Sequence, residues 1–238
     1  MELAIIGYGR MGREIETVAL QRGHSVRLII DADNASDLNQ RNMAGIDAAI
    51  EFSLPSTAWH NVSACLNYST PVVSGTTGWL VDLKKIEEIC AAKKTSFIHS
   101  SNFSIGVNLL FRLNAELARQ MNKYAEYTVS IEETHHVKKL DAPSGTAISL
   151  AKGIINEHEH YLSWHRGKTA ADGSIPVESF REGEEPGTHI VKWDSDIDTI
   201  SLTHNSKNRR GLAFGAVIAA ELIAKRTGIF TMENIMGF

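Results

Sequence analysis

Residues 3–14, LAIIGYGRMGRE, decide the fold, because they join a short apolar run to a glycine-rich turn and the first turns of a helix. Gly7, Gly9 and Gly12 have the GxGxxG spacing. The first glycine permits a tight turn, the second lets the backbone approach a pyrophosphate, and the third lets the helix pack closely on the strand. Because the helix N-terminus then faces the phosphates, the stretch favours dinucleotide binding over a purely structural turn.

The next apolar run, SVRLIID at 25–31, ends in an aspartate where dinucleotide-binding folds place one. We expect the Asp31 carboxylate to accept hydrogen bonds from the adenosine ribose, with a helix N-cap as the alternative role. ADNAS follows Asp31, with no adjacent arginine to bind a 2′-phosphate, so we expect NADH to be preferred over NADPH or used equally well. Arg27 and Arg41 are the basic residues that could still serve NADPH.

Short apolar runs alternate with helical patterns through the first hundred residues, which predicts a Rossmann-like parallel sheet with right-handed crossovers. The expected strands are 3–7, 25–31, 47–52, 70–75 and 95–100, and the expected helices are 10–22, 55–67 and 80–93. The short polar segment 32–46 predicts an abbreviated crossover.

After residue 104 the pattern changes to that of an α+β domain with a mixed or antiparallel sheet. The expected elements are a helix at 105–123, a strand at 127–136, a helix at 145–158, several strand-like runs over 172–205 and an apolar helix at 211–226. The last helix can return to cover the first domain. We therefore expect one domain over 1–104 and 211–238, with a second domain over 105–210 inserted into it.

Composition narrows the class of protein. The chain has 238 residues, of which 43% are hydrophobic, and a formal net charge of −4, so nothing draws it to nucleic acid or to anionic membranes. Its two cysteines lack CxxC spacing, which argues against a disulfide scaffold and fits a reducing compartment. No apolar run approaches the roughly 20 residues that span a bilayer, and the start does not resemble a signal peptide. We expect a cytoplasmic protein.

The segment ETHHVKKLDAPSGTA, at 133–147, gathers titratable side chains. Adjacent histidines at the end of a strand point to opposite faces, and no further ligand follows at a zinc-like spacing, so we predict no metal site. Acid–base chemistry at His135 fits better, because histidine side chains in general titrate near neutrality and Lys139 can share the pocket and bind an anion.

The turn DAPSGT, at 141–146, opens a helix. Ser144 and Thr146 offer hydroxyls, and the backbone N–H groups of Gly145 and Thr146 form a ready site for a carboxylate. The alternative is an exposed turn with Ser144 as an ordinary N-cap. In the same way, SGTTGW at 74–79 can approach the nicotinamide end of a cofactor or be a simple strand-to-helix turn.

Together these motifs resemble the dihydrodipicolinate reductase family of the diaminopimelate–lysine pathway. The resemblance rests on GYGRMGRE, SGTTGW, SSNFSIGVN, EETHHVKKLDAPSGTA and HNSKNRRGLAFGA, which extend from residue 7 to residue 216. It implies reduction of 4-hydroxy-tetrahydrodipicolinate (dihydrodipicolinate), a small cyclic dicarboxylate, to tetrahydrodipicolinate by NADH or NADPH. The domain over 1–104 and 211–238 would bind the dinucleotide, and the domain over 105–210 would bind substrate and assemble a homotetramer.

The resemblance also implies residue roles. His135 is the proton donor, Lys139 the second catalytic residue and His136 a substrate contact, while Ser144, Gly145 and Thr146 lie at a substrate carboxylate. The residues implied in cofactor binding are Gly7, Gly9, Arg10, Met11, Gly12, Asp31, Gly75, Thr76, Thr77, Ser100, Ser101, Asn102 and Phe103.

Two other classes remain open from the residues alone. A different two-domain reductase or amino-acid dehydrogenase would share the plan, and a non-enzymatic NAD(H)-sensing regulator would share the dinucleotide fold. Such a regulator does not need His135 and Lys139 and usually carries a basic DNA-reading segment, which this sequence does not show.

Overall fold

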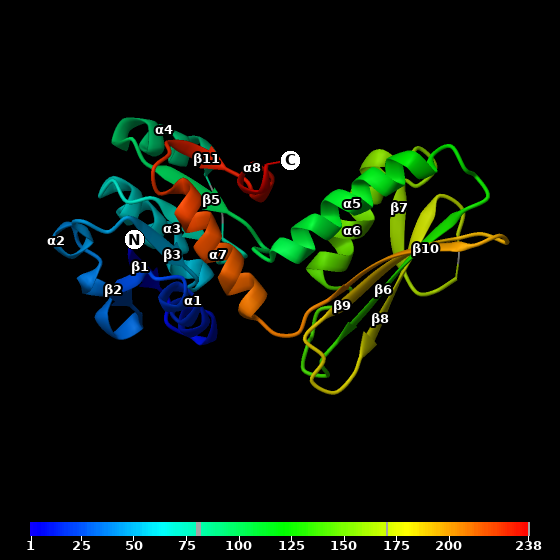
Figure 1. Cartoon of the computed structure of the whole chain (residues 1–238), viewed down its shortest axis with the longest axis horizontal. Helices are drawn as coiled ribbons and strands as arrows, with labels where there is room; N and C mark the ends of the chain where they lie inside the picture. Colours follow the sequence, from blue (N-terminus) through cyan, green and yellow to red (C-terminus); the bar gives the residue numbers. More distant parts are fainter. Residues whose placement is uncertain (80–81, 170, 238) are drawn as a thin grey trace. The chain divides into compact units, whose positions relative to one another are not determined.

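The computed structural model describes residues 1–79, 82–169 and 171–237. It divides into two compact units, Met1–Ile105 with Arg209–Phe238, and Gly106–Asn208 (Figure 1). The chain therefore leaves the first unit once and returns to it.

The first unit is built on a six-stranded parallel sheet with the order β11-β5-β4-β3-β1-β2. Its strands are β1 (Glu2–Ile6), β2 (Ser25–Ile30), β3 (Ala48–Glu51), β4 (Val72–Ser74), β5 (Ser96–His99) and β11 (Gly228–Phe230). The Rossmann-like fold predicted from the alternating pattern is confirmed. The sixth strand, β11, had not been predicted, since its three residues give too short a signal.

Helices cover both faces of this sheet because successive residues of β1 point to opposite sides. Leu3 and Ile5 pack with α1 (Arg10–Gln21), α7 (Arg210–Ile223) and α8 (Met232–Met236). Ala4 and Ile6 face the other core, which includes residues of α2 (Gln40–Met43), α3 (Pro55–Asn67) and α4 (Leu83–Lys93). The helix expected over 80–93 is described from Leu83, since residues 80 and 81 lie outside the described part of the chain. A short 3-10 helix, η1 (Ala32–Asp37), and α2 make the abbreviated crossover.

The second unit has a five-stranded mixed sheet with the order β10-β9-β6-β8-β7. Its strands are β6 (Thr128–His135), β7 (Ser163–Arg166), β8 (Ser174–Arg181), β9 (Thr188–Asp194) and β10 (Thr199–Asn205). β6 pairs in parallel with β8 and antiparallel with β9. The predicted mixed sheet is thereby confirmed, although the sequence pattern had given no sign of β7.

The helices α5 (Ile105–Met121) and α6 (Gly145–Glu157) pack on this sheet around Ile131, Val177 and the fully buried Trp193. Residues of β6 alternate between buried and half-buried positions, so Val129, Ile131, Glu133 and His135 share its buried side. Two apolar residues on that side are thus followed by two titratable ones.

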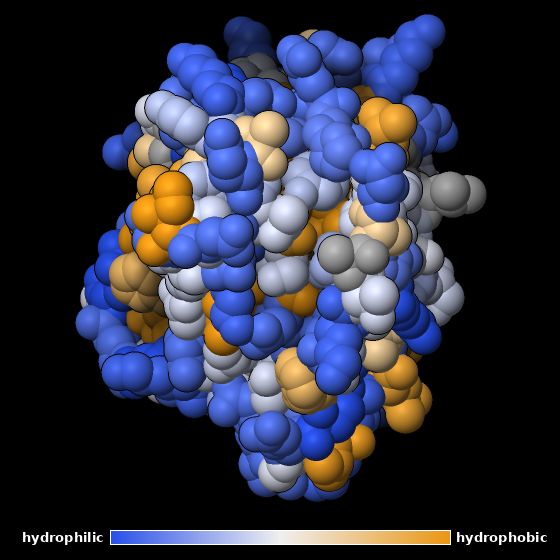
Figure 2. Space-filling view, turned by 90° about the vertical axis from the view of Figure 1, so that its right-hand side faces the viewer, coloured by the Kyte–Doolittle hydropathy of each residue, from blue (hydrophilic) through white to orange (hydrophobic). Residues whose placement is uncertain are grey.

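The hydropathy of the surface and of the helices can be compared with that of membrane proteins. The face of the molecule in Figure 2 is mainly hydrophilic, with apolar residues in separate patches. Among the described residues, no helix is both long and apolar enough to cross a bilayer.

Candidate active site

In the first unit, the glycine turn has the contacts that its spacing predicts. Gly7 has φ +89°, and a Cβ there would lie 2.1 Å from the Phe52 carbonyl oxygen. A Cβ on Gly12 would lie 2.3 Å from the Gly7 carbonyl oxygen, whereas one on Gly9 would meet nothing within 4 Å. Packing therefore requires glycine at positions 7 and 12. Gly9 leaves open space at the position where a bound dinucleotide is expected to contact the protein backbone.

A cavity of about 340 Å³ lies at this turn. Gly7, Gly9 and Asp31 line it, together with Tyr8, Ser53 and Asn61 among others. Asp31 is exposed and also caps η1, since its side chain accepts from the Ala32 N–H at 3.0 Å. The N-cap role considered for Asp31 is thus confirmed, and Asp31 also lines the cavity.

Other predicted cofactor residues lie at the turn or at the carboxyl ends of neighbouring strands without lining that cavity. Arg10 is exposed in the first turn of α1, while Met11 packs on the core. Thr76 is buried, and its hydroxyl donates to Glu51 at 2.7 Å, whereas Thr77 is exposed. Gly75 lies against the Phe52 ring, because a Cβ there would be 2.1 Å from it.

The segment after β5 is a turn fixed by its own hydrogen bonds. The Ser100 hydroxyl donates to the Asn102 carbonyl at 2.9 Å and accepts from the Asn102 N–H at 3.1 Å. Ser101 is exposed and Phe103 is buried, with its ring centroid 6.0 Å from that of Phe52. This segment thereby packs at the same edge of the sheet as Gly7 and Gly75.

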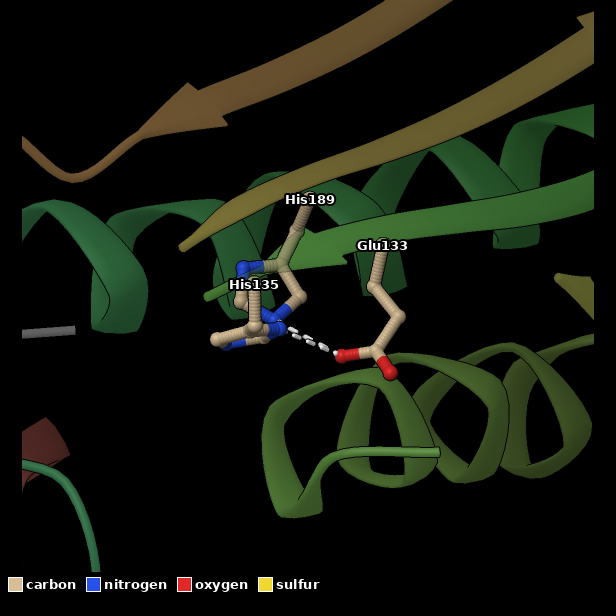
Figure 3. Close-up of side chains that lie close together, drawn as sticks. All are labelled: Glu133, His135 and His189. Atoms are coloured by element: carbon tan, nitrogen blue, oxygen red, sulfur yellow. Dashed lines mark ion pairs between the residues drawn. The ribbon is translucent and has the colours of Figure 1, made fainter. Parts of the chain in front are cut away.

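In the second unit, strand register gathers the candidate catalytic groups. Glu133 and His189 are direct partners between β6 and β9, and His135 and Arg181 are partners between β6 and β8. His135 Nδ1 lies 2.8 Å from Glu133 Oε2, and His189 Nε2 lies 4.0 Å from the same oxygen (Figure 3). The rings of His135 and His189 meet edge to face with centroids 5.1 Å apart.

Glu133 is 1% exposed, and its other oxygen accepts from the Arg181 guanidinium at 3.2 and 3.3 Å. Burial raises the pKa of this carboxyl, but polar contacts with His135, Ser144 and Ser179 outweigh burial and hold the pKa well below its ordinary range. His135 Nδ1 and Glu133 Oε2 are close but not aligned for a straight hydrogen bond, and neither has another hydrogen-bond partner in the described chain.

His189 is also buried. Its pKa is lowered to about 4, mainly because of burial and to a smaller extent because of the neighbouring His135. Its Nε2 lies 3.1 Å from the Ser144 hydroxyl, which in turn accepts from the Ala147 N–H at 3.2 Å. Ser144 is therefore the N-cap of α6, as the alternative reading held, and it also links that helix to the histidine pair.

Lys139 follows β6 in a loop that Arg181 holds. The Arg181 guanidinium donates to the carbonyl oxygens of Lys139 at 3.3 Å and Asp141 at 2.7 Å. The Lys139 ammonium lies 2.8 and 2.9 Å from the two Asp141 carboxylate oxygens, and this contact lowers the pKa of Asp141. Gly145 and half-buried Thr146 form the first turn of α6, and His136 is half-buried just after β6.

The sequence analysis missed Glu133, Arg181 and His189. Glu133 could have been found, because a carboxylate on the apolar side of a predicted strand needs a partner. His189 lies 54 residues after His135, so only the β6–β9 pairing brings it close. Ligand atoms of Glu133, His135 and His189 lie within 4.8 Å of one another. The sequence spacing on which the prediction of no metal site rested could not detect this group, and that prediction stays a prediction.

A Rossmann-like unit joined to a unit with a buried His–Glu pair and a helix N-terminus defines the class of dinucleotide-dependent oxidoreductases. Comparison with protein families narrows the class: residues 1–103 match the model "Dihydrodipicolinate reductase, N-terminus" and residues 106–236 match "Dihydrodipicolinate reductase, C-terminus". The chain belongs to the dihydrodipicolinate reductase family, and the resemblance inferred from its motifs is confirmed.

Relatives support this assignment over the whole chain. A 4-hydroxy-tetrahydrodipicolinate reductase from Christiangramia forsetii is 46% identical over 237 residues, covering 99% of this chain and 98% of the relative. One from Rickettsia bellii is 36% identical over 228 residues, covering 94% and 89%. The solved structure of dipicolinate-bound dihydrodipicolinate reductase from Paenisporosarcina sp. TG-14 has a TM-score of 0.82 at 23% identity, covers 99% of both chains and supports the fold. The family is one of nicotinamide-dependent oxidoreductases in diaminopimelate and lysine biosynthesis.

Proposed function

We propose that this chain reduces 4-hydroxy-tetrahydrodipicolinate to tetrahydrodipicolinate with NADH or NADPH and that His135 supplies the proton. The observation that carries the proposal is the His135–Glu133 pair beside the N-terminus of α6, in a chain whose two halves both match the family. The balanced reaction consumes one substrate, one reduced cofactor and one proton, and releases tetrahydrodipicolinate, oxidised cofactor and water.

Loss of water from the 4-hydroxy substrate leaves an α,β-unsaturated cyclic imine, and a bound reduced nicotinamide would supply a hydride to the ring of this imine. The electron pair then resides in an enamine, whose carbon must take a proton. Protonated His135 donates that proton from Nε2, while Glu133 holds the proton that stays on Nδ1. Arg181 neutralises the second oxygen of Glu133 and fixes the loop that carries Lys139. Lys139 acts as the second catalytic residue and attracts the anionic substrate.

The substrate carries two carboxylates, and we assign one of them to the N–H groups of Gly145 and Thr146. A 13-residue helix begins at Gly145, so its N-terminus favours an anion. Ser144 orients this end through its contact with His189, and His136 contacts the substrate. Thr146→Val should raise the substrate KM about 10- to 100-fold, the effect of losing one hydrogen bond to a charged group, and leave NADH binding unchanged. Loss of NADH affinity instead would contradict this assignment.

For the first unit, the proposal assigns the pyrophosphate to the N-terminus of α1 and the ribose to Asp31. The loops after β4 and β5 take the nicotinamide side, and the open space at Gly9 supports this assignment. The proposed cofactor contacts are those predicted from the sequence: Gly7, Gly9, Arg10, Met11, Gly12, Asp31, Gly75, Thr76, Thr77, Ser100, Ser101, Asn102 and Phe103.

NADH is the proposed preferred cofactor. Asp31 repels a 2′-phosphate, and Arg27, one of two arginines that could bind one, donates instead to the Ala44 carbonyl. A kcat/KM for NADH equal to or above that for NADPH is expected. A clear NADPH preference would show that Arg41 or another basic side chain reaches the 2′ position.

The decisive test is a substrate-dependent loss of absorbance from reduced cofactor by the purified chain. His136→Gln should chiefly raise substrate KM, whereas Lys139→Ala should lower kcat and raise KM. Oxidation of reduced cofactor with an amino acid or a 2-oxo acid plus ammonia, but not with 4-hydroxy-tetrahydrodipicolinate, would favour a related dehydrogenase. Cofactor binding without turnover of any of these would favour a sensor. The homotetramer and the cytoplasmic location stay predictions, and sedimentation of the purified chain tests the first.

A further inference from the structure

A buried carboxylate in the first unit has no part in the reaction proposed above. Glu51 is the last residue of β3 and is 0% exposed. Strand register places it between Ile6 of β1 and Ser74 of β4, at the carboxyl edge of the parallel sheet. Ligands of such sheets bind at that edge, so a buried charge there faces the region where a dinucleotide is expected.

Four donors satisfy the Glu51 carboxylate. Oε1 accepts from the Ser53 N–H at 3.0 Å, from the Ser53 hydroxyl and from the Thr76 hydroxyl at 2.7 Å. Oε2 accepts from the Ser74 hydroxyl at 2.6 Å. Two of these donors belong to the loop after β3 and two to the end of β4 and its loop, so one side chain joins both loops.

The joined groups extend to the cavity and to β5. Asn61 donates to the Ser53 hydroxyl at 3.1 Å, and both residues line the cavity at the glycine turn. On the other side, the Thr76 carbonyl accepts from Trp79 Nε1 at 2.8 Å and lies 3.0 Å from His99 Nε2. Glu51 thus lies directly behind the cavity lining and is hydrogen-bonded to the loop after β3 and to the loop after β4.

We propose that Glu51 is a positioning residue that sets the separation of the Ser53 and Thr76 loops before the cofactor binds. It acts through those two residues and touches no cofactor itself. Loops held in their binding geometry lose less conformational entropy on binding, so the network raises affinity without adding a contact. The inference rests on the proposed function only in taking NADH as the cofactor.

Fluorescence titration with NADH, at a temperature where every variant is folded, tests the proposal. Glu51→Gln should raise the NADH Kd about tenfold, because a charge-assisted network weakens, and should leave the substrate KM within about twofold of wild type. Ser74→Ala should also raise the NADH Kd, because Ser74 donates to Glu51 Oε2 and is not one of the proposed cofactor contacts.

Thr95→Val is the matched control. Thr95 is buried in the same unit just before β5, and its hydroxyl has no hydrogen-bond partner in the described part of the chain. An NADH Kd within twofold of wild type in Glu51→Gln, with only a lower melting temperature, would overturn the proposal. If Glu51→Gln does not fold, an NADH Kd for Ser74→Ala within twofold of wild type overturns the proposal instead. A wild type that binds NADH but turns over no substrate would contradict the proposed reaction and leave this comparison intact.

Discussion

The two units each bury a glutamate near the end of a strand, and the surroundings of these glutamates differ. In the described part of the chain, Glu51 accepts only from neutral donors, Ser53, Ser74 and Thr76. Glu133 faces titratable or charged groups, His135, Arg181 and His189. Neutral hydroxyl and amide donors can hold a loop but do not exchange protons near neutrality, whereas histidine is the side chain most often used in general acid–base catalysis. We infer that the first carboxylate serves geometry and the second serves proton transfer.

The largest effect should come from His135, since the comparison assigns proton transfer to its neighbourhood. His135→Gln should lower kcat about 10²- to 10⁴-fold, the usual worth of general acid catalysis, and leave NADH affinity unchanged. Steady-state kinetics with NADH titration by fluorescence measures both. Turnover near that of wild type would remove the proton-transfer role from the second unit.

Glu133→Gln sharpens the comparison between the two carboxylates. Losing one charged contact beside the proposed proton donor should lower kcat about 10- to 100-fold, whereas Glu51→Gln should not lower kcat to this extent. Glu132→Gln is the control, since Glu132 is the preceding residue of β6 and pairs with Lys192 at the half-buried surface. Steady-state kinetics measures all three variants, and equal kcat values for Glu133→Gln and Glu132→Gln would remove the role in proton transfer from Glu133.

The surroundings of a carboxylate can be predicted from the sequence only where its neighbours are close to it in the chain. The first unit has local signals, alternating apolar runs and a glycine turn, so its fold and the loops around Glu51 could be predicted. The region around Glu133 depends on pairing between β6, β8 and β9, whose members are 46 or more residues apart at the site. Local reading found His135, Lys139 and the turn before α6, because they lie in one segment. It could not find Arg181 or His189, which strand register brings there.

Gly187→Ala tests whether turnover depends on the observed position of the His135 side chain. Gly187 has φ +146°, and a Cβ there would lie 2.9 Å from His135 Nε2, the atom assigned to donate the proton. Displacing a reacting group by about 1 Å can cost roughly 10²-fold, so we expect kcat to fall about 10- to 100-fold. Gly183→Ala is the control, since Gly183 also has a positive φ, +45°, but a Cβ there meets nothing within 4 Å. Equal losses in both variants would mean that backbone strain, not the contact with His135, is responsible.

The smallest expected effect concerns stability around Glu133. Burial lowers the pKa of His189 to about 4, from an ordinary value of 6.5. Below pH 6.5 the unfolded chain takes up a proton at this residue while the folded chain does not, so stability falls as the pH drops from about 6.5 to about 4. The loss between pH 7 and pH 5 should be about 1.8 kcal/mol, because the slope approaches its full value of about 1.4 kcal/mol per pH unit only well below pH 6.5. Urea unfolding at pH 7 and pH 5 measures it, and His189→Gln should remove this part of the difference, while His60→Gln, at an exposed histidine of the first unit, should not. If the stability difference between pH 7 and pH 5 is the same in His189→Gln as in wild type, the low pKa of His189 does not cause the pH dependence. The surroundings of Glu133 would then differ less from those of Glu51 in their response to pH than we infer.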